Sequence, residues 1–174
     1  PGSGKTTISK QLSNDINITH RIGTGFIRES LRAHLSKDDT PALFEYTFRC
    51  KMKELRSHDF AQAQIVCKSV NAIIKRAQAE GTSIIIEGSH IVPSLIDVSE
   101  KPLIILIDCP DASLKSRLTS NTHAKRIITE EDINNIRELR QILAQDARQN
   151  NVPVLLNSCL PETVRAIIGM VGTK

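Results

Sequence analysis

The sequence contains no tryptophan, one tyrosine and only four phenylalanines. The core of such a chain must therefore be built from Ile, Leu, Val and Ala. Its four cysteines show neither a C-x-x-C spacing nor a metal-binding pattern. This argues against a zinc site or a redox motif and favours the reduced thiols of an intracellular protein. The length of 174 residues predicts a single domain, residues 1–174.

The chain also lacks an apolar run long enough to cross a membrane and a Lys/Arg run long enough to follow a nucleic acid. The formal net charge of +4 and the pI of about 9.0 are a mild basic excess that suits an anionic small molecule. We therefore expect a cytoplasmic protein with an anionic small-molecule substrate, and neither nucleic acid nor membrane as a partner. The sequence gives no indication of the oligomeric state.

The first seven residues, PGSGKTT, match the end of the phosphate-binding P-loop pattern G-x-x-x-x-G-K-[ST]. Apolar residues at i, i+4 and i+8 after the motif predict the helix that such a loop needs. In this motif backbone N–H groups surround phosphate, the Lys reaches the terminal phosphates, and the Thr hydroxyl binds Mg²⁺. We predict that ATP phosphates are bound by Gly2, Ser3, Gly4, Lys5, Thr6 and Thr7. Lys5 is also a catalytic candidate, and Thr6 a metal ligand.

The opening glycine of the pattern, and the buried strand that precedes a P-loop, would fall before Pro1. We therefore expect the chain to be truncated at its N-terminus, with its first strand missing.

Helix and strand signals alternate along the chain, which predicts an α/β fold with a parallel sheet covered on both faces. We expect strands over 18–22, 83–87, 103–107 and 152–156. We expect helices over 5–15, 26–35, 111–120, 130–150 and 161–171, with Thr24 as the N-cap of the second. Between these lies a long helical stretch, broken near 57–59. An acceptor-side helical region should occupy about 36–64.

Ligands of parallel sheets bind beyond the carboxyl ends of the strands, and two candidates follow the strand over 83–87. Glu87 could hold Mg²⁺ through water or accept a proton from an attacking hydroxyl; the alternative is a solvated strand-end acid. His90 could bind substrate or serve only the fold. After the first strand, Thr24 and Arg28 are substrate-binding candidates, because both lie at the turn into the next helix.

Arginines point to phosphate chemistry, because phosphoryl transfer needs several positive charges around the transferred group. Arg140 lies within the apolar face of the helix over 130–150, and Arg137 lies at its edge. A buried guanidinium needs an anionic partner or a wet cleft, so both are catalytic candidates; a stem packed on the surface is the alternative. The polar stretch over 118–129 has the composition of a mobile lid, and its Arg126 is a candidate ligand of ATP.

Together these motifs resemble the 2-phosphoglycerate kinase family, P-loop kinases with a nucleoside-monophosphate-kinase-like core. The resemblance rests on PGSGKTT, on RIGTGFIRE over 21–29, on QAEGTSIIIEGSHIVP over 78–93, and on IR at 136–137 and VPV at 152–154. The block Glu-Gly-x-His-x-x-Pro after a buried strand is its most specific part. The fold implied is a three-layer P-loop NTPase sandwich. In such kinases the strand before the P-loop would lie between the strand that ends at Glu87 and the one that ends at Ile107.

The resemblance further implies ATP and Mg²⁺ as cofactors and transfer to 2-phosphoglycerate. The product would be 2,3-bisphosphoglycerate, an intermediate toward cyclic 2,3-diphosphoglycerate. Related sequences often carry Asp where this chain has Gly25, so one carboxylate on the substrate side is missing. Two alternatives stay open: a kinase for another phosphorylated or hydroxylated metabolite, and a regulatory ATP-binding module without an acceptor.

Overall fold

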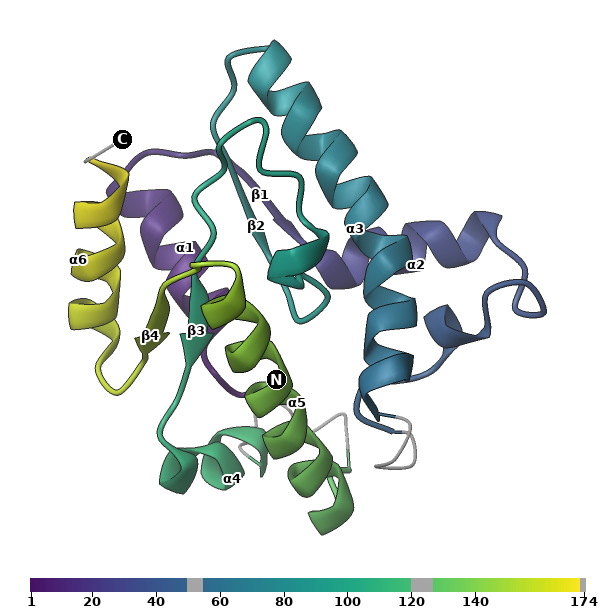
Figure 1. Ribbon diagram of the computed structural model, residues 1–174. Coiled ribbons are helices and arrows are strands. Elements are labelled where there is room, and N and C mark those ends of the chain that lie inside the picture. The colour runs from purple at the N-terminus through teal and green to yellow at the C-terminus, as the bar shows by residue number, and fades with distance from the viewer. Residues whose placement is uncertain (50–54, 120–126, 173–174) are drawn as a thin grey trace.

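Four short parallel strands form two separate pairs in the computed structural model, which describes residues 1–49, 55–119 and 127–172 (Figure 1). Strand β1 (His20–Gly23) pairs with β2 (Ile84–Glu87), in a register that sets Gly23 opposite Glu87. Strand β3 (Leu106–Asp108) pairs with β4 (Val154–Leu156), in a register that sets Asp108 opposite Leu156. Within the described ranges β2 and β3 are not paired with each other. The predicted α/β class with parallel strands is thus confirmed, whereas a continuous sheet is not observed.

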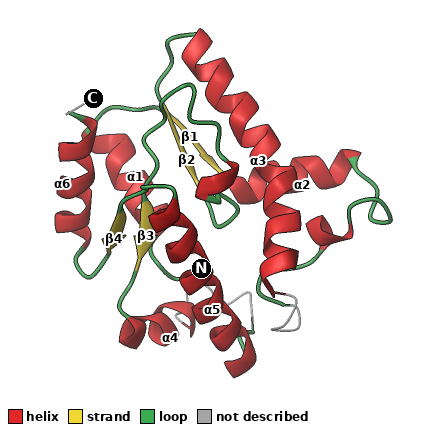
Figure 2. Cartoon of the chain, in the orientation of Figure 1, coloured by secondary structure: helices red, strands yellow, loops and turns green. Residues whose placement is uncertain are grey.

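Helices make up most of the remaining structure (Figure 2). They are α1 (Lys5–Asp15), α2 (Thr24–His34), α3 (Leu55–Ala79), α4 (Asp111–Thr119), α5 (Glu130–Gln149) and α6 (Leu160–Val171), with short 3₁₀ turns η1 (Pro41–Phe44) and η3 (Pro93–Leu95). No described helix combines the length and the hydropathy needed to cross a bilayer.

The strands are covered by apolar side chains from two directions. Ile8 and Leu12 of α1 pack with Val164 and Ile167 of α6, against strand residues that include Ile85. The next residue of β2, Ile86, packs instead with a cluster centred on α2 and α3. Because neighbouring strand residues point to opposite faces, β2 is a strand with both faces covered, as its continuous apolar run predicted.

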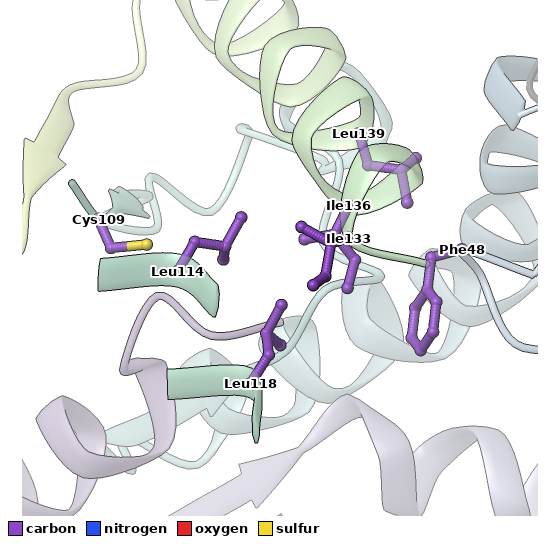
Figure 3. Packing of buried hydrophobic residues seen from close by; sticks show 7 residues of the cluster. All are labelled: Phe48, Cys109, Leu114, Leu118, Ile133, Ile136 and Leu139. Carbon is purple, nitrogen blue, oxygen red and sulfur yellow. The ribbon is translucent and has the colours of Figure 1, made fainter. Parts of the chain in front are cut away.

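A third cluster joins α4 to α5 (Figure 3). Leu114 and Leu118 of α4 lie against Ile133 and Ile136 of α5, and Phe48 closes the other side of the cluster. The first turn of α5 is fixed by a capping box, in which the Thr129 hydroxyl accepts from the Asp132 N–H and the Asp132 carboxylate accepts from the Thr129 N–H. These contacts hold the apolar face predicted for this helix.

Several predicted element limits were wrong, among them the starts of β1 and β4, and three of the differences concern α3, β3 and α2. Helix α3 runs without a break through 57–59, because packing of its buried face outweighs the weak helix propensity of Ser, His and Asp. The third strand begins only at Leu106 and not at 103, because Pro153, directly before the partner strand β4, has no N–H with which to extend the ladder. Thr24 is the first residue of α2 and not its cap, and its hydroxyl makes no capping bond.

Candidate functional site

The predicted P-loop has the left-handed backbone that its glycines permit. Gly2 and Gly4 have φ of +78° and +89°, and α1 begins immediately afterwards at Lys5. A side chain at Gly4 would collide with the amide of Asn157, so both its conformation and its surroundings require glycine. The loop therefore directs the N-terminal end of a helix, with its partial positive charge, at the space where a phosphate would bind.

Asn157, directly after β4, holds this loop from the other end of the chain. Its Nδ2 donates to the Ser3 carbonyl at 2.8 Å, and its Oδ1 accepts from the Thr163 hydroxyl at 3.3 Å. Arg117 of α4 donates to the Asn157 carbonyl at 3.0 Å. The shape of the P-loop thus depends on a buried amide fixed by two other elements.

Lys5, Thr6 and Glu87 meet at the start of α1. The Lys5 ammonium donates to the Ser3 hydroxyl at 3.2 Å, and the Thr6 hydroxyl donates to Glu87 Oε1 at 2.9 Å. Burial lowers the pKa of Lys5, although the negative charge of Glu87 opposes that shift. Both predicted metal ligands therefore lie side by side, next to the predicted catalytic lysine.

A hydroxyl and a carboxylate are oxygen ligands of the kind Mg²⁺ prefers. No group of three or more His, Cys, Asp or Glu side chains suited to a metal occurs in the described part of the chain. The pair Thr6 and Glu87 therefore fits an ion that keeps several waters and binds nucleotide phosphates, and does not fit an ion caged entirely by protein.

Thr24 and His90 form a buried pair on the other side of Glu87. The Thr24 hydroxyl lies 2.8 Å from His90 Nδ1, while Nε2 of the same ring is buried without a hydrogen-bond partner. Burial, and then the nearby charges of Arg28 and Lys5, lower the pKa of His90 to about 4, so the imidazole is neutral near pH 7. A side chain at Gly88 would collide with the Thr24 hydroxyl, so the pair also requires glycine there.

Arg28 of α2 lies beside this pair with only 14 % of its side chain exposed. Its Nη1 donates to the Glu45 carbonyl at 3.3 Å, and its Nη2 pairs with Glu29 at 3.1 Å. Its Nε is buried and has no hydrogen-bond partner. One donor of this guanidinium is therefore left available for a ligand.

One cleft of about 1060 Å³ connects these groups. Its lining includes P-loop residues, the Thr24–His90 pair, Arg28, Glu87 and the aromatic residues Phe26, Tyr46 and Phe48. The cleft opens where β1 and β2 end and where α1 and α2 begin, the edge of a parallel sheet at which ligands bind.

Part of the predicted acceptor-side region forms one wall of the cleft. Thr47 donates to the buried Gln62 of α3 at 2.7 Å, and Gln62 donates to the carbonyls of Ala42 and Glu45. Asn135 of α5 donates to the Phe48 carbonyl at 2.9 Å. Amide side chains from two helices thus fix this wall, while its role in binding an acceptor stays a prediction.

The structure does not bring Arg137 and Arg140 to the cleft. Both line a second cavity of about 400 Å³ beside α5. Arg140 pairs with Asp108 at 2.7 Å and with Asp111 at 3.0 Å, and also donates to the Cys109 carbonyl. Arg137 pairs with Asp111 at 3.3 Å. The anionic partners expected for these arginines are therefore protein carboxylates, and their catalytic role stays a prediction.

Arg126 and most of the predicted lid lie outside the described residues. Leu118 and Ile128, near the two ends of that segment, line the cleft.

Comparison of the chain with known proteins finds similarity to one group of kinases. No protein-family model matches the chain. Curated 2-phosphoglycerate kinases match it along nearly all of its length: 31 % identity over 194 residues with the protein of a Methanococcus maripaludis strain, and 33 % over 181 residues with that of Pyrococcus horikoshii. The protein of Methanopyrus kandleri is 26 % identical over 191 residues. The chain is a relative of the 2-phosphoglycerate kinases.

The resemblance to this family, inferred from the sequence motifs, is therefore confirmed. These alignments take in 99 %, 96 % and 99 % of this chain and 62 %, 60 % and 58 % of the respective relatives. The chain thus spans about three-fifths of the length of the 2-phosphoglycerate kinases that it matches.

Two residues of the site had no role assigned from the sequence. Asn157 could be singled out only as a residue that follows a strand, and Gly88 only as part of the motif after Glu87. Position after a strand is the signal that marks both, since such residues gather at one edge of a parallel sheet. The contacts that give them a role join segments far apart in the sequence.

Proposed function

We propose that this chain forms the catalytic part of an ATP-dependent kinase that phosphorylates 2-phosphoglycerate to 2,3-bisphosphoglycerate. The observation that carries the proposal is that one cleft joins a P-loop lysine, the Thr6–Glu87 pair and two residues with an unpartnered buried nitrogen, Arg28 and His90. The relatives are named for that activity. We also propose the fold of these kinases, a three-layer P-loop sandwich with a nucleoside-monophosphate-kinase-like core.

In the proposed reaction the ATP phosphates bind the backbone N–H groups of the P-loop. Mg²⁺, held by the Thr6 hydroxyl and by Glu87 directly or through water, would neutralise phosphate charge when bound. The acceptor hydroxyl oxygen forms a bond to the γ-phosphorus, the bond from that phosphorus to the β–γ bridging oxygen breaks, and ADP leaves. The Lys5 ammonium stabilises the charge that develops on the bridging oxygen.

Glu87 has two roles open to it in this scheme, because it lies between the P-loop and the acceptor side. It can hold the ion, or it can accept the proton that leaves the attacking hydroxyl. Its hydrogen bond from Thr6 keeps one carboxylate oxygen next to the P-loop in either role.

A kinase with a different acceptor is the second candidate, and Gly25 is the observation that favours it. Gly25 lines the cleft, and a Cβ built there meets nothing within 4 Å. Where related kinases often place an Asp, this site therefore offers space without a charge. A larger or more anionic acceptor would fit that difference.

The test is ADP release by the full-length protein across a panel of phosphorylated three-carbon acids. We expect the highest kcat/KM with 2-phosphoglycerate, and a product with two phosphomonoester signals in phosphorus NMR. A higher kcat/KM with another acid would support the second candidate. ATP binding without any acceptor-dependent turnover would instead indicate a regulatory module.

A further inference from the structure

Two buried side-chain nitrogens without hydrogen-bond partners belong to His90 and Arg28, neighbouring residues that line the same cleft. His90 is 94 % buried, since its exposed fraction is 6 %, and its Nε2 has no hydrogen-bond partner. Nε of Arg28, which also lines the cleft, is likewise buried without a hydrogen-bond partner. Buried polar atoms in a folded protein nearly always have a hydrogen-bond partner. Two such atoms without one, on residues of a single cleft, therefore indicate a ligand that forms hydrogen bonds with both.

The chemistry of His90 Nε2 depends on which ring nitrogen carries the proton, and Thr24 decides this. The Thr24 side chain is fully buried, and among the described residues its hydroxyl has His90 Nδ1 as its only hydrogen-bond partner. If Nδ1 carried the proton, the hydroxyl would accept that bond and its own proton would have no acceptor. If Nδ1 is unprotonated, the hydroxyl donates to it and no further group is left unpaired.

The second arrangement places the single proton of the neutral ring on Nε2, which makes this atom a donor. Arg28 Nε is a donor in every state, because a guanidinium keeps its protons. Two donors on neighbouring residues of one cleft match the oxygens of a carboxylate or a phosphate. They do not match an alcohol that must give up its proton.

We propose that Thr24 fixes the Nε2–H tautomer of His90, so that His90 and Arg28 together bind the non-reacting anionic group of the acceptor. His90 is then a binding residue and not the general base, and Thr24 is a positioning residue that acts through it. The inference rests on the proposed function for the identity of the acceptor. It assigns the proton-accepting role, by exclusion, to Glu87 or to water.

The tautomer can be measured without turnover, in full-length protein labelled with ¹⁵N-histidine. His90 is one of five histidines, and its signals are identified by their absence in His90→Gln. We expect an unprotonated Nδ1 and a protonated Nε2 between pH 5.5 and about 8. Thr24→Val should remove this preference and Thr24→Ser should retain it. An Nδ1–H tautomer in the wild type would overturn the proposal.

The anionic group can be identified with two analogues of the acceptor, each of which lacks one of the two charged groups of 2-phosphoglycerate. Glycerol 2-phosphate keeps the phosphate, and glycerate keeps the carboxylate. We expect one of them to shift the Nε2 signal, and we expect His90→Ala to weaken its binding about tenfold or more. His90→Gln, whose amide nitrogen can take the place of Nε2, should restore most of that affinity.

The outcomes separate this inference from the proposed function. If neither anion shifts the Nε2 signal, the proposed binding role of His90 is wrong, whatever the kinase activity. If the tautomer and the anion response are as expected but 2-phosphoglycerate gives no ADP release, only the assigned reaction is wrong. In the active enzyme, the change in kcat/KM between pH 8 and pH 6 should also be the same in the wild type and in His90→Gln.

Discussion

Gly88 shows how closely single residues are fitted at this site. It follows the strand-end carboxylate Glu87, and its missing side chain leaves room for the hydroxyl of Thr24. That hydroxyl is in turn the partner of His90. A residue with no side chain therefore determines whether two others can meet.

We expect Gly88→Ala to destabilise the protein by about 1–3 kcal/mol, because the added methyl group would overlap the Thr24 hydroxyl. Gly25→Ala is the matched control, since a Cβ there meets nothing within 4 Å and Ala favours helix formation. Urea unfolding measures both. Equal effects of the two substitutions would contradict the close contact.

Lys5→Ala should lower kcat by about a hundredfold or more, because the ammonium stabilises charge that develops only during transfer. The fold should persist, since the loop is held by glycine conformations and by Asn157. Initial rates together with circular dichroism check both points. A well-folded Lys5→Ala protein with near-normal turnover would rule out the kinase mechanism.

His90 should make stability depend on pH in the acid range. Its pKa is about 4 in the folded protein, against 6.5 as the ordinary value. Between these values the unfolded chain binds a proton that the folded chain excludes, so stability falls as pH drops from about 6.5 to 4. The loss should reach up to about 3 kcal/mol. Urea unfolding of wild type and His90→Gln isolates this part, and parallel pH curves would contradict it.

At the scale of elements, α5 and the end of β3 are tied by the arginines of α5. Arg140 is 18 % exposed and bonds two carboxylates and a carbonyl, whereas Arg137 is 39 % exposed. A guanidinium shared among three acceptors is fixed in place. These contacts hold the end of β3 against the helix that carries Arg140.

Arg140→Met should therefore lower stability by about 1–3 kcal/mol, because Asp108 loses its partner while the stem still packs. Arg137→Met, at a more exposed pair, should cost less than about 1 kcal/mol. The predicted phosphate role adds a large fall in kcat/KM for Arg140→Met. Thermal unfolding measures the loss of stability, and steady-state kinetics measures the fall in kcat/KM. An unchanged kcat/KM in Arg140→Met would show that Arg140 has only a structural role.

The helices were largely predictable from the sequence, because apolar spacing is a local signal. Helix α1 covers the predicted 5–15, and α5 ends one residue before the predicted end. The glycine-rich loop before α1 was predictable from a local motif as well. The partners of Arg140 and Asn157 were not, since each contact joins segments that only the folded chain brings together. The start of β3 was missed because it depends on Pro153, which directly precedes β4.

At the scale of the whole molecule, the two strand pairs lie apart (Figure 1). Within the described residues β2 pairs only with β1, and β3 only with β4. In this part of the chain β2 and β3 therefore each have one edge whose backbone N–H and C=O groups are not paired with another strand. Such an edge can pair with a further strand. The sequence-based prediction of a further strand between them fits this arrangement.

The 174-residue chain alone should accordingly unfold without a cooperative transition, because each dry unpaired backbone group costs about 1–3 kcal/mol and a domain has only about 5–15 kcal/mol to lose. Adding a Val/Ile-rich strand and the first loop glycine before Pro1 should restore cooperative unfolding and ATP binding. Calorimetry of both chains tests this. Cooperative melting and micromolar ATP binding by the shorter chain would contradict the predicted position of the strand.

The contact from Asn157 to Ser3 joins nearly opposite ends of the chain, and α1 packs on α6 in the same region. A ribosome makes Ser3 among the first of these residues and Thr163, which fixes Asn157, among the last. During translation the glycine loop therefore emerges long before the amide that shapes it. A nascent chain therefore lacks the contact between Asn157 and this loop until α6 has left the ribosome.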